Sequence, residues 1–195
     1  MLKMSLSAGK KNMSLSQIKA TSQHHSPEAA YVLGVRVDRL SQRQALDSIE
    51  QIIAQWRASD RAQVCQQIVT VNPEFVMEAQ HNKDFRTAID AAALIVADGV
   101  GVVWATRYLG RPVPERVTGT DLLPELAQRC AATGYRLYLL GAAPGIAEAA
   151  GARLQELAPG LVIAGTYAGS PAPNEEEEAG ISAQVGPGMA LPALS

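Results

Sequence analysis

The sequence lacks any apolar run long enough to cross a bilayer. Polar residues interrupt its hydrophobic stretches well before the about 18 consecutive apolar residues that a transmembrane helix needs. The first 28 residues contain Lys3, Lys10 and Lys11 but no continuous apolar core of the kind found in secretory signals. We therefore expect residues 1–28 to be a mobile leader.

Excess positive charge and aromatic side chains are also missing. Seventeen Lys and Arg stand against 19 Asp and Glu, so the formal net charge of −2 provides no general attraction for nucleic-acid phosphates. Aromatic residues make up 5% of the chain, too few to suggest a platform on which single-stranded bases stack. We expect no nucleic-acid partner.

Cysteine is scarce. The two cysteines, Cys65 and Cys130, are far apart, and neither belongs to a Cys-x-x-Cys or Cys/His group with the spacing of metal ligands. Cys130 falls on the apolar face of a predicted helix, which indicates packing and not a nucleophile. No metal site and no cofactor are expected, and a reducing, cytoplasmic environment suits the two thiols.

The composition that remains is globular, with 47% hydrophobic and 18% charged residues in 195 positions. Short apolar runs alternate with helical patterns between residues 31 and 164, without an internal repeat. This alternation predicts an α/β fold of three layers, with a mainly parallel, Rossmann-like sheet covered by helices on both faces. Residues 29–168 form the predicted domain, and residues 169–195 are expected to be an irregular tail that is acidic and rich in Pro and Gly.

Local signals predict where the elements begin. Ser41 and Gln44 have the form of a capping box, Asn72 followed by Pro73 marks another helix start, and Thr120 is the expected cap of a third helix. The predicted strands are 31–37, 67–71, 91–96, 135–140 and 161–164, and the helices start at 41, 73, 83, 99, 120 and 147.

Asp98 is the main catalytic candidate. It follows a buried strand, and ligands of open α/β sheets bind at the carboxyl ends of the strands. Gly99 and Gly101 place no Cβ beside it, which favours close approach of a substrate. Arg116 follows a Pro-Val-Pro-Glu segment that cannot be helical, so a loop presents its guanidinium. Two simpler interpretations stay open: Asp98 caps the helix that follows, and Arg116 pairs with a nearby surface acid, Glu115 or Asp121.

Two further strand ends contain candidate binding residues. Thr70 and Asn72 lie where a strand passes into a helix, and backbone N–H groups at such a helix start favour anions. The alternative is that Asn72 only caps the helix and Thr70 only fills the strand. Gly141 and Gly145 flank a loop of small residues between a strand and a helix, whose backbone can contact a phosphate although it lacks the Lys-Ser/Thr ending of a P-loop.

Five stretches, in this order, carry a resemblance: LGVRVD, VTVNPEFV, ADGVGVVWA, PERVTGTDLLPEL and YRLYLLGAAPGIAEAA. Together they resemble the bacterial WecG/TagA/CpsF-type glycosyltransferases over residues 31–168. The resemblance implies inverting, metal-free transfer of a sugar such as N-acetylmannosamine from a UDP-sugar to a polyprenyl-diphosphate-linked acceptor, in surface polysaccharide synthesis. It also implies that Asp98 is the catalytic base, that Thr70 and Asn72 are polar active-site residues, and that Arg116 holds the donor's diphosphate.

The resemblance fades after Tyr167. Family members continue with a Gly-x-Pro-Lys-Gln-Glu loop and a basic, membrane-docking appendage, neither of which the sequence contains, so a C-terminally truncated enzyme is expected. Its contact with the inner face of the cell membrane should then be weak and peripheral. Two alternatives remain: an inactive nucleotide-binding relic, and a dinucleotide-binding oxidoreductase, for which the third glycine of the motif is replaced by Trp104. A homo-oligomer is also left open.

Overall fold

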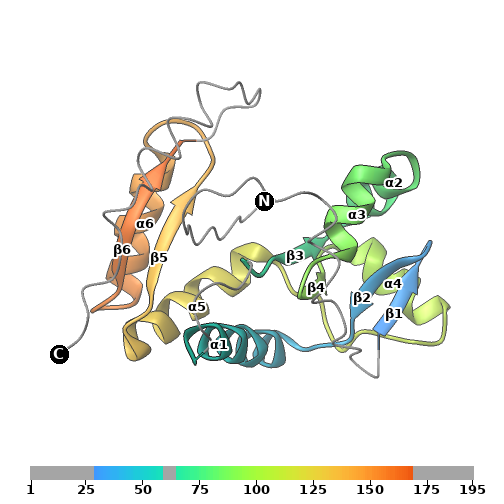
Figure 1. The fold of residues 1–195 in the computed structure, drawn as a ribbon, viewed down its shortest axis with the longest axis horizontal. Coiled ribbons are helices and arrows are strands. Elements are labelled where there is room, and N and C mark those ends of the chain that lie inside the picture. The colour runs from blue at the N-terminus through green and yellow to red at the C-terminus, as the bar shows by residue number, and fades with distance from the viewer. Residues whose placement is uncertain (1–28, 59–64, 169–195) are drawn as a thin grey trace.

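The computed structural model describes residues 29–58 and 65–168 (Figure 1). The predicted leader and the predicted tail lie outside these residues. The described elements, in chain order, are β1 (Ala29–Val32), β2 (Val35–Asp38), α1 (Gln42–Ala58), β3 (Ile68–Val71), α2 (Pro73–His81), α3 (Lys83–Asp90), β4 (Leu94–Ala97), α4 (Val100–Tyr108), α5 (Gly119–Thr133), β5 (Arg136–Leu140), α6 (Ile146–Leu157) and β6 (Val162–Tyr167).

β3 and β4 pair in parallel, with Thr70 opposite Val96 and Val71 opposite Ala97. All four residues of β4 are buried, as expected for a parallel strand covered on both faces. Alternate residues of β4 enter different cores: Leu94 and Val96 pack with α1, α5, α6 and β5, whereas Ile95 and Ala97 pack with the β1–β2 hairpin and α2, α3 and α4. The short sheet is therefore the middle of three layers.

The pairing of the strands confirms the predicted α/β class and its mainly parallel character. β5 and β6 are parallel, and β1 and β2 form an antiparallel hairpin. Among the described residues, the strands form three two-stranded ladders, and α5 lies between the β5–β6 pair and the β3–β4 pair (Figure 1). β2 reaches β4 through a side chain, because the buried Asp38 Oδ2 accepts a hydrogen bond of 2.8 Å from Ile95 N.

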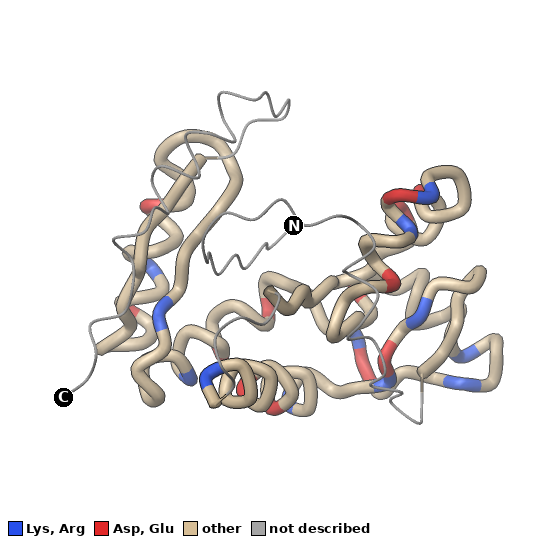
Figure 2. Tube along the Cα trace, viewed as in Figure 1, with Lys and Arg blue, Asp and Glu red and all other residues tan. Residues whose placement is uncertain are grey.

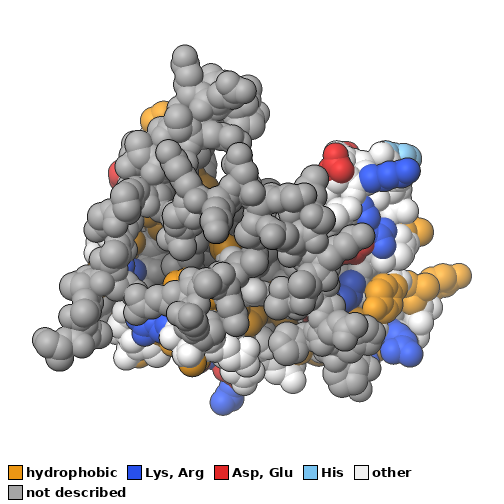
Figure 3. All heavy atoms as spheres, in the orientation of Figure 1, with side chains coloured by type: hydrophobic (Ala, Val, Ile, Leu, Met, Phe, Trp, Pro, Cys, Tyr) orange, Lys and Arg blue, Asp and Glu red, His pale blue; other side chains and the backbone are white. Residues whose placement is uncertain are grey.

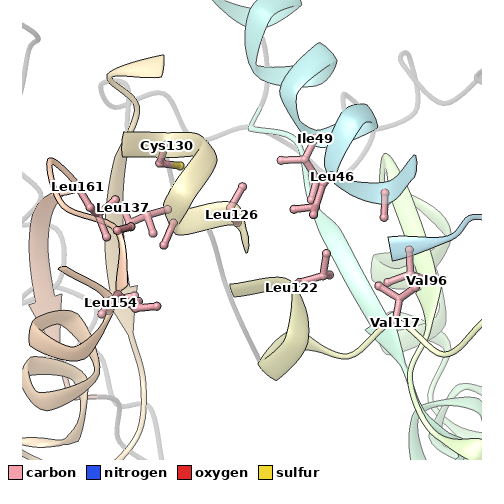
Figure 4. Packing of buried hydrophobic residues seen from close by; sticks show 14 of the residues in the cluster. Leu46, Ile49, Val96, Val117, Leu122, Leu126, Cys130, Leu137, Leu154 and Leu161 are labelled. Carbon is pink, nitrogen blue, oxygen red and sulfur yellow. The ribbon is translucent and has the colours of Figure 1, made fainter. Parts of the chain in front are cut away.

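The larger core joins α1, α5 and the β5–β6–α6 unit (Figure 4). Leu46 and Ile49 of α1 face Leu122 and Leu126 of α5. The cluster of packed side chains extends from there through Cys130 towards β5. Cys130 is fully buried, and burial raises the pKa of its thiol to about 11. The prediction that Cys130 packs in the core is confirmed, and its thiol is in the unreactive protonated form near neutral pH.

Four local predictions were wrong in detail. The strand predicted at 91–96 is shorter and begins at Leu94, because Ala91 still caps the end of α3. Residues 31–37 are not one strand, because Leu33 and Gly34 adopt positive φ angles of 47° and 80° and turn the chain into a hairpin. The cap of α5 is Thr118 and not Thr120, since Thr118 Oγ1 accepts a hydrogen bond from Asp121 N. The last predicted strand, 161–164, extends to Tyr167 because β5 pairs with it over its whole length.

Other predicted caps are confirmed. Ser41 and Gln44 form the reciprocal capping box, with Gln44 Oε1 accepting from Ser41 N at 2.8 Å and Ser41 Oγ accepting from Gln44 N at 3.3 Å. Gly134 ends α5 in the left-handed conformation. None of the described helices has both the length and the apolar character that a membrane span requires.

Candidate functional site

Two backbone hydrogen bonds assemble the edge on which Asp98 lies. On one side of β4, Asp98 N donates to Val71 O at 2.7 Å, which continues the parallel register past the end of β3. On the other side, Val117 N donates to Ala97 O at 2.8 Å. Asn72 directly follows Val71, and Arg116 directly precedes Val117, so Asp98 lies between the backbone segments that carry these two residues.

The Asp98 side chain is partly exposed at this edge. No described residue forms an ion pair or hydrogen bond with its carboxylate. The interpretation of Asp98 as a helix cap is wrong, since Gly99 occupies the cap position of α4 and no side chain caps this helix. Asp98 is thus a carboxylate whose oxygens accept no hydrogen bond from the described part of the chain, at the carboxyl end of a buried strand.

The glycines after Asp98 have a structural cause. Gly99 has a φ of 98°, and a Cβ there would lie 3.2 Å from Pro73 Cδ. A Cβ on Gly101 would lie 2.9 Å from Pro73 Cγ, closer than real Cβ atoms approach. The first turns of α2 and α4 therefore touch through these glycines. The space that the sequence suggested for a substrate is filled by Pro73 on this side, and contact between Gly99 and a substrate stays a prediction.

Asn72 caps α2, as its simpler interpretation stated. Its Oδ1 accepts a hydrogen bond of 2.9 Å from Phe75 N, which leaves the amide nitrogen of the side chain as a donor for other groups. Thr70 is partly buried on β3 and faces the same side of the sheet as Val96. Because side chains alternate along a strand, Asp98 continues that face, so Thr70 and Asp98 share one side of the sheet.

Arg116 belongs to a loop, residues 109–117, that is fastened at several points. The bonds are Arg39 Nε to Pro112 O at 2.8 Å, Gln42 N to Glu115 Oε1 at 2.7 Å, Val113 N to Thr106 Oγ1 at 3.2 Å, and Arg111 N to Thr106 O at 2.9 Å. The Arg116 guanidinium is 51% exposed and lies 4.0 Å from Asp121 Oδ2. This ion pair is the surface partner that the simpler interpretation expected, and at this exposure it contributes little to stability. Glu115 instead bonds the first backbone N–H of α1.

Helix starts surround the same edge. α2 begins after Asn72, α4 begins after Gly99, and α5 begins after Thr118, one residue beyond the Val117–Ala97 hydrogen bond. The side chains of Asn72 and Thr118 each satisfy one N–H group of their helices, whereas α4 has no side-chain cap. The unbonded N–H groups and the dipole of α4 therefore favour an anion beside Asp98.

Gly141 and Gly145 are not brought to this edge. They lie in the loop between β5 and α6, on the opposite side of α5 from β3 and β4 (Figure 1). Their φ angles of 117° and 83° explain why glycine is needed there. Hydrogen bonds lower the pKa of the Glu148 carboxyl. The largest effect comes from the Glu148 backbone N–H, and the next largest comes from the Thr166 hydroxyl. A carboxylate of the chain itself thus already uses N–H groups at the start of α6, and phosphate binding by this loop stays a prediction.

Comparison with known proteins identifies the fold family. The sequence profile of the glycosyl transferase WecG/TagA/CpsF family matches residues 30–187. The chain belongs to this family. Among its relatives are the N-acetylglucosaminyldiphosphoundecaprenol N-acetyl-beta-D-mannosaminyltransferases of Staphylococcus aureus strains NCTC 8325, COL and MRSA252, each 32% identical over 133 residues. The match covers 68% of this chain and 50% of each relative, so the chain spans about half the length of the curated relatives it matches.

Family membership removes the rival interpretation of this WecG/TagA/CpsF-family chain as a dinucleotide-binding oxidoreductase. Trp104, which stands in place of the third glycine of that motif, does not obstruct packing of the helix, because its side chain is 67% exposed. Within the described residues, no group of three or more His, Cys, Asp and Glu side chains is placed so that it could hold a metal ion.

Sequence reasoning missed three residues that position the site of this family member. Thr118 has the spacing of a capping box, Thr-x-x-Asp, which was a usable signal. Thr106 and Asp38 are buried polar residues whose partners, Val113 and Ile95, become neighbours only in the folded chain. No local pattern in the sequence indicates these pairings. A shallow hollow of about 400 Å³ on α2, lined by Pro73, Glu74, Met77, Glu78 and His81, was also not foreseen.

Proposed function

We propose that this chain acts in glycosyl transfer, moving a sugar from a nucleotide diphosphate donor to a polyprenyl-diphosphate-linked sugar with inversion at the anomeric carbon. The observation that carries the proposal is the pair of hydrogen bonds, Asp98 N to Val71 O and Val117 N to Ala97 O, which align Asn72, Asp98 and Arg116 along one sheet edge. The names of the relatives support the acceptor class, N-acetylglucosaminyldiphosphoundecaprenol, and N-acetylmannosamine as the sugar.

In the proposed reaction Asp98 is the general base. The acceptor hydroxyl oxygen attacks the anomeric carbon, its proton passes to the Asp98 carboxylate, and the bond between the sugar and the diphosphate breaks on the opposite face. The absence of a described partner for the carboxylate supports this role, since its oxygens are available to an incoming hydroxyl. One carboxylate is enough because the stereochemistry inverts in a single displacement.

The departing diphosphate gains negative charge as the sugar leaves. Arg116 and the uncapped N–H groups at the start of α4 supply positive charge and donors near Asp98. A guanidinium is suited to this task because its planar donors match pairs of phosphate oxygens. Asn72 contributes a side-chain amide donor, and Thr70 a hydroxyl, on the β3 side of the edge. We propose UDP as the leaving group and the cytoplasmic face of the cell membrane as the place of reaction.

The test replaces the base while keeping its shape. Asp98→Asn should lower the turnover of UDP-N-acetylmannosamine with a lipid-linked N-acetylglucosamine acceptor by roughly two to four orders of magnitude, the range for loss of a general base. UDP binding, measured by calorimetry, should be nearly unchanged. Asp84→Asn, an exposed change in the first turn of α3, is the matched control and should retain activity.

Two other results have clear meanings. If the unaltered chain binds UDP but never transfers sugar, it is a nucleotide-binding relic and the proposal fails. If Asp98→Asn transfers sugar at a near-normal rate while UDP binding collapses, Asp98 is a binding residue and the base lies elsewhere.

A further inference from the structure

The outer face of α4 carries large apolar side chains where a surface helix normally carries charge. Val100, Trp104 and Tyr108 follow one another at intervals of four residues, so they form one stripe along the helix. Their side chains are 60%, 67% and 93% exposed, and the following Leu109 is 52% exposed. Val102, Val103 and Thr106 on the opposite side are buried in the core. The stripe is therefore not needed to hold α4 in the fold.

Positive charge borders this stripe. Arg107 in the last turn of α4 and Arg111 in the loop after it are both exposed, and α4 itself contains no acidic residue. Figure 2 shows two basic segments, without an acidic one between them, where α4 passes into that loop. Figure 3 shows hydrophobic and basic side chains close together at the end of the molecule that holds β1, β2 and α4. We call Val100, Trp104, Arg107, Tyr108 and Arg111 the α4 surface.

We infer that the α4 surface docks on an anionic lipid membrane. Trp and Tyr side chains favour the boundary between headgroups and acyl chains, and arginines beside them attract lipid phosphates. The inference rests on the proposed function, in which the acceptor sugar is carried by a polyprenyl chain. α4 starts directly after Asp98 and Gly99 and is nine residues long, about 14 Å, so docking holds the reacting edge within one helix length of the headgroups.

A second copy of the chain fits this surface less well. In a two-fold interface each patch meets itself. If two antiparallel α4 helices overlap only at their C-terminal ends, Arg107 and Arg111 of the two copies approach each other. If the helices overlap along their whole length, these arginines approach the Asp98 end of the partner helix. The first arrangement brings like charges together, and the second closes the edge at which the reaction is proposed. Lipid phosphates offer the opposite charge without either conflict.

Vesicle binding tests the inference. The full chain should co-sediment with vesicles of 30% phosphatidylglycerol in phosphatidylcholine more strongly than with phosphatidylcholine alone, and raising the salt should weaken this binding. Trp104→Ser with Tyr108→Ser should lower the partition coefficient by at least about tenfold, because both aromatic contacts with the interface are lost. The matched control is Ile146→Ser with Val162→Ser, a pair 55% and 49% exposed on α6 and β6, away from α4, which should change binding less than about twofold.

A spectroscopic measurement locates the contact directly. The chain contains two tryptophans, so Trp56→Phe leaves Trp104 as the single reporter. Its emission should shift to shorter wavelength on addition of the anionic vesicles, and lipids brominated on the acyl chains should quench it. Unchanged emission under conditions in which the protein sediments would place the membrane contact on another surface and overturn the inference.

The inference and the proposed function fail in different ways. With a short-chain, water-soluble acceptor, the Trp104→Ser, Tyr108→Ser variant should keep its turnover, whereas Asp98→Asn should lose it. With the acceptor embedded in vesicles, both variants should be impaired. If the double variant instead converts a dimer to a monomer in sedimentation velocity and binds vesicles normally, the α4 surface is a contact between copies.

Discussion

Arg116 and Asp98 are expected to serve different parts of the proposed reaction, and substitution separates them. Arg116→Ala removes a charge-assisted contact to the diphosphate that strengthens as the sugar leaves. Donor affinity should therefore fall about tenfold or more and turnover should fall with it, whereas Asp98→Asn should affect turnover alone. Calorimetry with UDP beside steady-state kinetics makes the distinction.

The Arg116→Ala variant should remain folded, so a loss of UDP affinity can be attributed to the missing guanidinium. The ion pair of Arg116 with Asp121 joins side chains that are about half exposed, so its removal should change the free energy of unfolding by less than about 1 kcal/mol. Arg43→Ala on the exposed side of α1 is the control for loss of a surface arginine. Unchanged UDP affinity in Arg116→Ala would contradict a role in holding the diphosphate.

Asp38 makes the stability of the chain depend on pH in a defined direction. Burial raises the pKa of its carboxyl above the ordinary 3.8, against the smaller opposing effects of the Ile95 N–H and the Arg36 guanidinium. Arg36 Nε lies 3.3 Å from Asp38 Oδ1 but without the alignment of a hydrogen bond. A raised pKa in the folded state means that the neutral carboxyl favours folding. Its contribution is complete below about pH 3.8 and is lost as the pH rises through the folded-state value.

Asp38→Asn isolates this effect. Asparagine keeps an oxygen for the Ile95 N–H but cannot ionise. The unfolding free energy of the unaltered chain, relative to Asp38→Asn, should therefore fall as the pH is raised from about 3.8, and urea titrations at several pH values measure it. The exposed Asp84→Asn should show no such trend. A relative stability that rises over the same range would mean that Arg36 outweighs the burial of the carboxylate.

At the scale of elements, the loop of residues 109–117 is held to α4 by Thr106. The buried Thr106 Oγ1 donates to Val103 O at 2.8 Å and accepts from Val113 N at 3.2 Å, so one hydroxyl joins the helix to the loop that carries Arg116. Thr106→Val keeps the shape and leaves the Val113 N–H without a partner. This should cost about 1–3 kcal/mol in the free energy of unfolding.

The same change should also affect the proposed site. A loosened loop presents Arg116 less precisely, so UDP affinity should fall several-fold in Thr106→Val even under conditions in which the variant is fully folded. Thr87→Val is the matched control, because the exposed Thr87 Oγ1 also bonds a backbone carbonyl within its helix, Lys83 O at 2.8 Å. If Thr106→Val is destabilised but binds UDP normally, the hydroxyl supports the fold and not the position of Arg116.

At the scale of the whole molecule, β4 belongs to both cores. Its even-numbered residues pack with α1 and α5, and its odd-numbered residues pack with the hairpin and α2 to α4. A change in one core should therefore lower the stability of the other. Leu46→Ala, at a fully buried position of α1, should cost about 2–5 kcal/mol.

Hydrogen exchange shows whether the loss of stability caused by Leu46→Ala extends to both cores. In Leu46→Ala, protection should fall by a similar factor for amides of α5 in the larger core and for amides of α2 and α4 in the smaller one. Leu157→Ala, 42% exposed on α6, is the control and should have a small effect. Loss of protection confined to α1, α5 and α6 would mean that the two cores unfold as separate units.

Local signals in the sequence were sufficient for much of this fold. The caps at Ser41 and Asn72, the end of α5 at Gly134 and the burial of Cys130 depend on residues within a few positions of each other, so one sequence contains all the information they need. The alternation of strands and helices determined the α/β class for the same reason. The position of Asp98 after a buried strand was likewise a local property.

Tertiary structure decided which segments meet at the end of β4, the strand that Asp98 follows. Whether residues 31–37 form one strand or a hairpin depended on the backbone at Leu33 and Gly34, which turns the chain so that β1 pairs with β2. The reason for Gly101 is the ring of Pro73, 28 positions earlier in the chain. Backbone hydrogen bonds between distant segments select which strand ends meet. They make neighbours of Asn72, Asp98 and Arg116 but not of Gly141 and Gly145. No pattern along the chain encodes that selection.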